Sequence, residues 1–167
     1  MDWMAELHDL GIVFFAGVLG AAIGFEREAS EKPAGLRTHI FVCAGSALLI
    51  LLGEAIVESY ESRDPGVISA DPTRVIHAIV VGLSFLGAGT IIHHGAHGVK
   101  GLTTAASIYL TAGIGIAVAV DRFVMAAGTT AFALMVLRLL RRAEERFETH
   151  HQKPDKPAPE KPNSEAE

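Results

Sequence analysis

Five long apolar stretches, separated by short polar segments, set the pattern of this chain. Apart from Glu54 near the end of the second stretch, they contain no Asp, Glu, Lys or Arg, and each is 15 to 19 residues long. A helix needs about 17–25 largely apolar residues to cross a bilayer, whereas a helix of a soluble bundle carries polar residues along one face. The pattern therefore predicts an all-α membrane protein of about five transmembrane helices, at residues 10–25, 39–57, 75–92, 102–120 and 123–137.

The positions of lysine and arginine predict how the chain is oriented in the membrane. With the N-terminus outside, 11 of the 14 basic residues fall on the cytoplasmic side, and the opposite topology reverses the ratio. Because cytoplasmic segments carry the excess of basic residues, we expect the N-terminus outside and the C-terminus in the cytoplasm. Residues 1–150 are expected to form the transmembrane domain. Residues 151–167, rich in proline and charge, are expected to form a disordered cytoplasmic tail.

Small residues recur at spacings that favour close helix packing. Gly20 and Gly24 form a GxxxG pattern, and Gly82 follows Ala78 at the same interval. Small residues let helix backbones approach each other in lipid; a glycine-lined substrate path is the alternative. We expect close packing at Gly20, Gly24, Gly35, Gly82, Gly87, Gly89 and Gly101.

A short internal repetition suggests a duplicated unit. The residues that open the second stretch read GLRT from Gly35, and those that open the fourth read GLTT from Gly101, 66 residues later. Glycines of the first stretch also recur in the third. The hypothesis is two related helical hairpins followed by one further helix.

Polar residues gather where the first stretch ends and the second begins, on the predicted cytoplasmic side. A lone charge at the membrane interface is costly, so we expect Glu26 to pair with Arg27 or Arg37. Thr103 or Thr104 is a candidate cap for the fourth helix, whose free N–H groups favour an anion. Interfacial anchoring is the alternative to function. The candidate polar residues, with two from the outer side, are Glu26, Arg27, Arg37, Thr38, Asp71, Arg74, Lys100, Thr103 and Thr104.

Other chemistry has less support in the sequence. Asp71 before Pro72 is the pattern of a helix N-cap, and needs no further role. His93, His94 and His97 could bind a soft metal, but no acidic or cysteine partner accompanies them, and a solvated, pH-sensitive loop is the alternative. We therefore assign no cofactor and no firm metal site. No catalytic motif predicts an enzyme, and a net charge of −5 does not favour nucleic-acid binding.

Five motifs, in their order and spacing, resemble the MgtC/SapB family of bacterial membrane proteins. They read GFERE, AGLRTH, DPTR, FLGAGTII and VKGLTTAASIYL, and the match runs from about Gly17 to Val120. The resemblance implies an inner-membrane protein of about five spans with a role in magnesium homeostasis, especially when magnesium is scarce. In pathogens it implies survival within host cells. We expect two departures from the family: a short charged tail in place of a sizeable cytoplasmic C-terminal domain, and HHGAH in a loop that often carries basic residues.

Three functions follow as hypotheses. The leading one is a non-enzymatic membrane protein that modulates another membrane protein in ion homeostasis. The second is a small oligomeric ion transporter with a polar site on its cytoplasmic side, and the third is a structural or assembly subunit. The expected partners are the lipid bilayer, another membrane protein and further copies of this chain.

Overall fold

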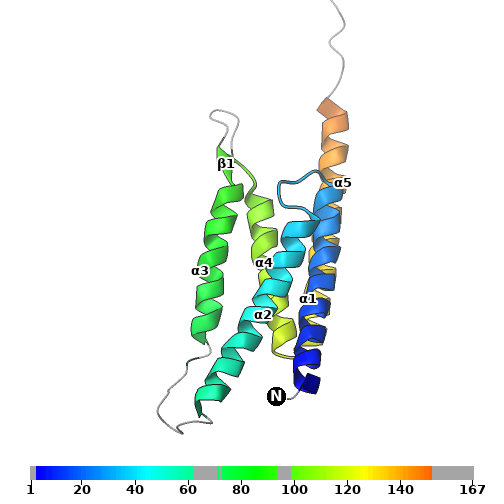
Figure 1. Cartoon of the computed structure of the whole chain (residues 1–167). Helices are drawn as coiled ribbons and strands as arrows, with labels where there is room; N and C mark the ends of the chain where they lie inside the picture. Colours follow the sequence, from blue (N-terminus) through cyan, green and yellow to red (C-terminus); the bar gives the residue numbers. More distant parts are fainter. Residues whose placement is uncertain (1–2, 62–70, 72, 94–98, 152–167) are drawn as a thin grey trace, which may run out of the picture.

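The computed structural model describes residues 3–61, 71, 73–93 and 99–151, which fold into five long helices and one small hairpin (Figure 1). Each helix is long and apolar enough to cross a membrane. The prediction of an all-α membrane protein with about five transmembrane helices is therefore confirmed. The helices are α1 (Trp3–Ala29), α2 (Leu36–Glu61), α3 (Thr73–Thr90), α4 (Leu102–Ala119) and α5 (Phe123–His151).

Consecutive helices run in opposite directions, so the ends of the bundle differ in content. At one end α1 and α3 finish and α2 and α4 begin; we call this the polar end (Figure 1). The described N-terminal residues and the beginning of α3 lie at the opposite end. The count of basic residues predicts that the polar end faces the cytoplasm, and this orientation stays a prediction. Residues 152–167, the expected tail, lie outside the described residues.

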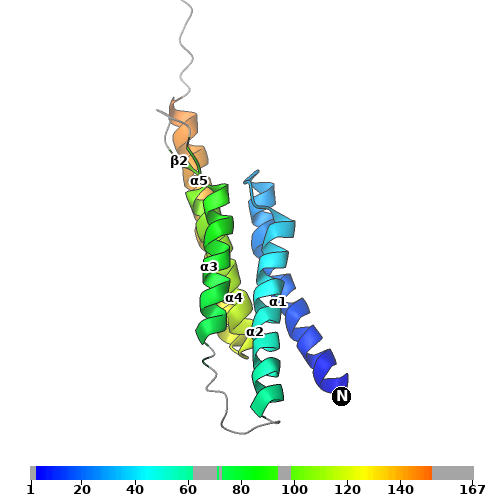
Figure 2. The same cartoon turned by 60° about the vertical axis from the view of Figure 1, so that its left-hand side comes forward.

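Helix α4 forms the centre of the bundle and contacts each of the other four helices (Figures 1 and 2). In its most apolar window 56% of the residues are buried, compared with 11% in α3. In lipid the apolar outer surfaces need no cover, so a chain of this length can leave most of its other helices exposed. The apolar core includes Ile12, Ala16, Ile23, Cys43, Ala47, Ile50, Ile79, Ile114 and Val118.

Glycines set the close approach of α1 to α2. A methyl group added at Gly20 would lie 2.5 Å from the His39 carbonyl oxygen and 2.7 Å from Cys43 Cβ. At Gly24 it would lie 2.7 Å from Leu36 Cα. Only glycine fits such contacts with a neighbouring backbone. Both residues of the GxxxG pattern therefore hold the α1–α2 hairpin together.

The other candidate packing glycines have varied surroundings. Gly35 lies against the Glu28 side chain, and Gly87 is in ordinary contact with Ala105. Gly82 is different, because an added methyl group would meet nothing within 4 Å in the described residues. The same holds for Gly89. In the described chain, therefore, neither Gly82 nor Gly89 packs against another helix.

A two-stranded hairpin joins α3 to α4, a feature that the sequence did not predict. Strands β1 (Ile92–His93) and β2 (Val99–Lys100) pair antiparallel, with Ile92 opposite Lys100. Gly101 follows with a φ of 95° and lies against the Thr90 backbone, so this position requires a glycine. Of the histidines expected here, His94 and His97 lie outside the described residues.

The two halves of the predicted duplication begin their second helices at equivalent places. Helix α2 begins at Leu36 and α4 at Leu102, each directly after the repeated glycine. The glycines of α1 and α3, the first helix of each half, have different surroundings. Gly24 packs on α2, whereas its counterpart Gly89 has no close neighbour. The duplication stays a hypothesis.

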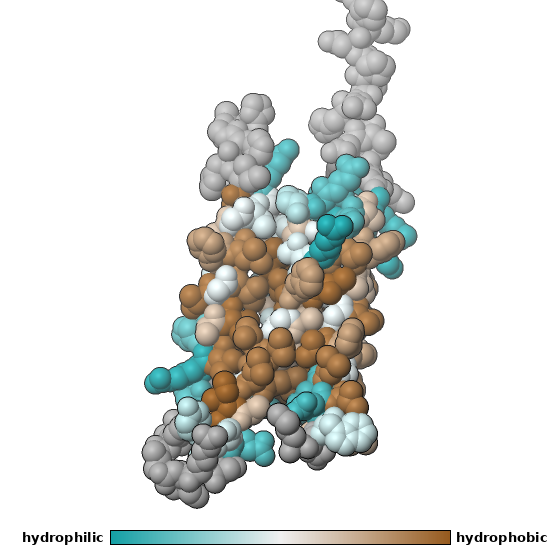
Figure 3. Space-filling model, viewed as in Figure 1, coloured by the Kyte–Doolittle hydropathy of each residue, from teal (hydrophilic) through white to brown (hydrophobic). Residues whose placement is uncertain are grey.

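On the face shown in Figure 3, apolar side chains cover the middle of the bundle and polar side chains lie toward its two ends. Exposed large apolar residues occur on every helix, among them Phe14, Phe41, Phe85, Tyr109 and Val124. This distribution matches a hydrocarbon core bounded by two aqueous interfaces.

Candidate functional site

A buried ion pair lies at the polar end, where α1 finishes. The Nε–H of Arg27 donates to a carboxylate oxygen of Glu26 at 2.7 Å, and both side chains are at least 95% buried. Burial of either charge alone would be costly, because the polar medium that stabilises it has been removed. Glu26 therefore pairs with Arg27, one of the two partners expected for it, while Arg37 is exposed.

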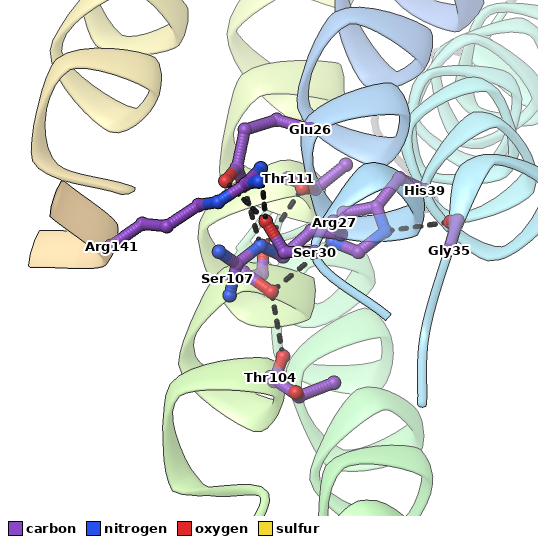
Figure 4. A network of polar contacts seen from close by, with 9 residues as sticks. All are labelled: Glu26, Arg27, Ser30, Gly35, His39, Thr104, Ser107, Thr111 and Arg141. Carbon is purple, nitrogen blue, oxygen red and sulfur yellow. Dashed lines mark hydrogen bonds and ion pairs between the residues drawn. The ribbon is translucent and has the colours of Figure 1, made fainter. Parts of the chain in front are cut away.

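The ion pair is connected to α5. The second carboxylate oxygen of Glu26 accepts a hydrogen bond of 2.9 Å from the Ser30 hydroxyl. Arg141, which extends from α5, donates to the same hydroxyl oxygen at 3.3 Å (Figure 4). Helix α5 continues to His151, and this continuation beyond the apolar stretch brings Arg141 to the site.

A second carboxylate stabilises the beginning of α2. Glu28 accepts a hydrogen bond of 2.8 Å from the backbone N–H of Leu36, the first residue of α2. A carboxylate at a helix N-terminus satisfies a free N–H group and interacts favourably with the helix dipole. The motif around Glu26 thus supplies one buried acid for the ion pair and one exposed acid for the cap.

His39 connects α2 with α4 inside the bundle. Its ring is fully buried; Nδ1 lies 2.9 Å from the Gly35 carbonyl oxygen and Nε2 lies 3.1 Å from the Ser107 hydroxyl (Figure 4). A carbonyl oxygen only accepts, so Nδ1 carries the proton in this contact. In the neutral ring Nε2 is then an acceptor, and Ser107 is the donor available to it.

Ser107 also belongs to a series of hydroxyl groups along α4. Its oxygen lies 2.8 Å from the Thr104 carbonyl oxygen, and its own carbonyl accepts from the Thr111 hydroxyl at 2.8 Å. A hydroxyl carries one hydrogen, so Ser107 donates either to Thr104 or to a neutral His39. The Ser107 hydroxyl therefore links the polar interior of α4 to His39 on α2.

The candidate residues from the sequence separate into three groups. Glu26, Arg27 and Thr104 are buried at the polar end. Asp71 and Arg74 lie near the beginning of α3, at the opposite end of the bundle. The remaining four lie at the polar end without being fully buried: Arg37, Thr38, Lys100 and Thr103.

The two predicted helix caps had different outcomes. Asp71 accepts hydrogen bonds from the Thr73 hydroxyl at 2.6 Å and the Thr73 N–H at 3.0 Å, so this cap is confirmed. The hydroxyl bond and then the N–H bond hold the pKa of Asp71 below its usual value. The threonine cap on α4 is wrong: Gly101 occupies that position without a side-chain cap, because the turn from β2 requires its left-handed backbone.

Sequence reasoning missed His39, Ser107, Ser30 and Arg141 as members of the site. A partial signal was present, because Ser107 follows Thr104 by three residues and precedes Thr111 by four, which places all three on one helix face. Nothing in a single sequence pairs that face with His39. Among the described residues, no group of three potential metal-binding side chains occurs.

Comparison with known proteins gives relatives over most of the chain. A model of the MgtC family matches residues 13–146. The chain is 39% identical over 132 residues to Protein MgtC of Salmonella typhimurium, covering 79% of this chain and 52% of that protein. It is 36% identical over 141 residues to Protein MgtC of Brucella abortus, covering 84% of this chain and 55% of that protein. The chain thus spans about half the length of these curated relatives. No solved structure matches it.

Five membrane-spanning helices with buried polar groups at one end define a multi-pass helical protein of the bacterial inner membrane. Within that class the chain belongs to the MgtC family. This membership confirms the family resemblance found in the motifs.

Proposed function

We propose that this chain supports magnesium homeostasis by binding and modulating another membrane protein, without catalysing a reaction. The family resemblance supports the link to magnesium. The mode of action rests on one observation, the position of the buried charged groups. In the described residues Glu26, Arg27 and His39 are confined to the polar end.

Deeper in the bundle the interior offers little to a passing cation. The hydroxyls of Thr111 and Thr130 donate to carbonyls of their own helices, and the surrounding core is apolar. Ion pathways need acidic groups or free oxygen atoms at intervals across the membrane. An interior with so few free oxygen atoms favours a protein that acts through its surfaces.

The transporter is the second candidate, and the buried carboxylate of Glu26 is the observation that favours it. Helices from several copies could enclose a path that one copy does not. Magnesium flux into liposomes containing the purified, folded protein separates the two functions. We expect no flux above that of empty liposomes. A flux that Glu26→Gln abolishes would replace the modulator with a transporter.

A structural or assembly subunit is the third possibility. It predicts that cells carrying Glu26→Gln or Arg37→Gln grow normally when magnesium is limiting. The modulator predicts that Glu26→Gln impairs growth under this condition, because the substitution disturbs the polar end of the folded protein.

A further inference from the structure

A groove open to the lipid runs between α2 and α3. Its volume is about 370 Å³. At one end the two helices touch, where a methyl group added at Gly53 would lie 2.9 Å from Val75 Cγ2. Away from that contact they separate, and the residues that line the groove include Phe41, Gly45, Ser46, Ala78, Gly82 and Leu86.

The walls of the groove carry glycines that the described chain does not use for packing. A methyl group added at Gly45 or at Gly82 would meet nothing within 4 Å. Gly20 and Gly24 of α1 show the opposite case, because each lies directly against the neighbouring helix α2. Gly45 and Gly82 are equally small, but no helix of the described chain packs against them.

A serine hydroxyl lies among the residues that line this groove. Ser46 is only 4% exposed and lines the groove, and no hydrogen bond joins its hydroxyl to another described residue. No fully enclosed side-chain oxygen of the described residues lacks a partner, so the Ser46 oxygen is open to the groove. The buried hydroxyls of Thr111 and Thr130 instead donate to carbonyls of their own helices. Ser46 is ten residues into α2, about 15 Å along the helix, and so lies near the middle of a hydrocarbon core about 30 Å thick.

We propose that the groove between α2 and α3 binds a transmembrane helix of the partner protein. That helix would place a hydrogen-bonding side chain, such as Asn, Gln, Ser or Thr, against Ser46. A lipid acyl chain fills apolar space but offers no hydrogen bond, whereas side chains of this kind bond across helices in lipid. The small walls let the incoming backbone approach closely. The inference rests on the proposed function and names the surface that carries it out.

Photo-crosslinking in cells limited for magnesium tests the proposal. A benzophenone amino acid is placed at Leu86, on the rim of the groove, and for comparison at Phe132, on the exposed face of α5. We expect an adduct from Leu86 alone. Mass spectrometry should place it in a transmembrane segment of another membrane protein that has a polar side chain within the span.

Two substitutions establish which contact the adduct reports. Gly82→Leu fills the groove and should abolish the adduct, whereas Gly128→Leu should leave it unchanged. Gly128 is the matched control because it is exposed on α5 and also has nothing within 4 Å. Ser46→Ala should weaken the adduct about three- to tenfold, the value of one hydrogen bond between helices in lipid. Both glycine variants improve helix propensity, and equal thermal stability shows that they fold.

Three outcomes would overturn the proposal: adducts to lipid alone, adducts to a second copy of this chain, or adducts that Gly82→Leu leaves intact. Failure of the proposed function is recognised separately. If the unmodified chain restores growth at limiting magnesium without ion flux, the proposed function stands and only this surface is rejected. If it does not restore growth, the proposed function itself fails.

Discussion

At the scale of single residues, the ion pair between Glu26 and Arg27 determines the chemistry of the polar end. Adjacent residues on a helix do not normally face each other, yet the long Arg27 side chain folds back so that its Nε reaches Glu26. The sequence predicted that Glu26 would have a basic partner, because an unpaired charge there is costly. It left two arginines open, since the choice depends on which side chain the hairpin buries.

Breaking this pair should destabilise the protein. Glu26→Gln leaves the Arg27 charge buried without a counter-charge, and we expect the free energy of unfolding to fall by about 3 kcal/mol. Glu6→Gln, on the exposed first turn of the same helix, is the control and should change it by less than about 0.5 kcal/mol. Denaturant unfolding in detergent micelles measures both. Equal stability of the two variants would contradict a buried pair.

His39 shows why part of the site could not be predicted. Arg37, two residues earlier in the chain, carries a charge but is exposed, whereas His39 faces α4 and is fully buried. The difference follows from how α2 is rotated against α4. Because the apolar stretches lack a polar face, the sequence contains little information about that rotation.

At the scale of elements, the apolar pattern was sufficient to locate all five helices. Helices α1, α2 and α5 extend past their apolar stretches because their charged ends remain helical at the interface, as in α5, which continues to His151. The hairpin of β1 and β2 was missed, since two residues per strand give no detectable alternation.

The contact between α1 and α2 gives a direct test of helix packing. Gly20→Ala places a methyl group 2.5 Å from the His39 carbonyl oxygen, so α1 must move away from α2. We expect the free energy of unfolding to fall by about 1–3 kcal/mol. Gly11→Ala in the same helix meets nothing within 4 Å and should be neutral or slightly stabilising. If both variants have the same stability, the packing of these helices is wrong.

The cap on α3 predicts a dependence on pH. Because the pKa of Asp71 is lowered in the folded protein, its carboxylate stabilises the fold above the unfolded pKa, near 4. That contribution is lost as the pH falls through the lower, folded value. Asp71→Ala should therefore reduce the thermal midpoint at pH 7, and the difference from the unmodified chain should shrink below pH 4. Asp71→Asn keeps a capping oxygen and should show a smaller loss at pH 7. A constant difference at all pH values would contradict the cap.

At the scale of the whole molecule, the structure gives the relative directions of the helices, and the basic residues predict which end is cytoplasmic. Cysteine labelling tests this orientation in a Cys43→Ala background. An impermeant maleimide added to intact cells should label Arg122→Cys, in the turn between α4 and α5, and leave Lys32→Cys unlabelled until the membrane is opened. The reverse pattern would place the polar end outside.

The groove between α2 and α3 belongs to this largest scale and could not have been predicted. Gly82 was expected to pack closely because of its spacing from Ala78, but spacing does not say whether a neighbouring helix comes from the same chain. In the described residues Gly82 has no such neighbour. The unused glycine, together with Ser46, instead supports a contact with another protein.

Growth at limiting magnesium reports directly whether the groove between α2 and α3 is needed for function. The growth rate is measured for a strain whose only copy of this protein is the unmodified chain, Gly82→Leu or Gly128→Leu, each present in the membrane at equal amount. We predict that the unmodified chain and Gly128→Leu restore growth and that Gly82→Leu does not. Full growth with Gly82→Leu, or no restoration by the unmodified chain, would contradict it.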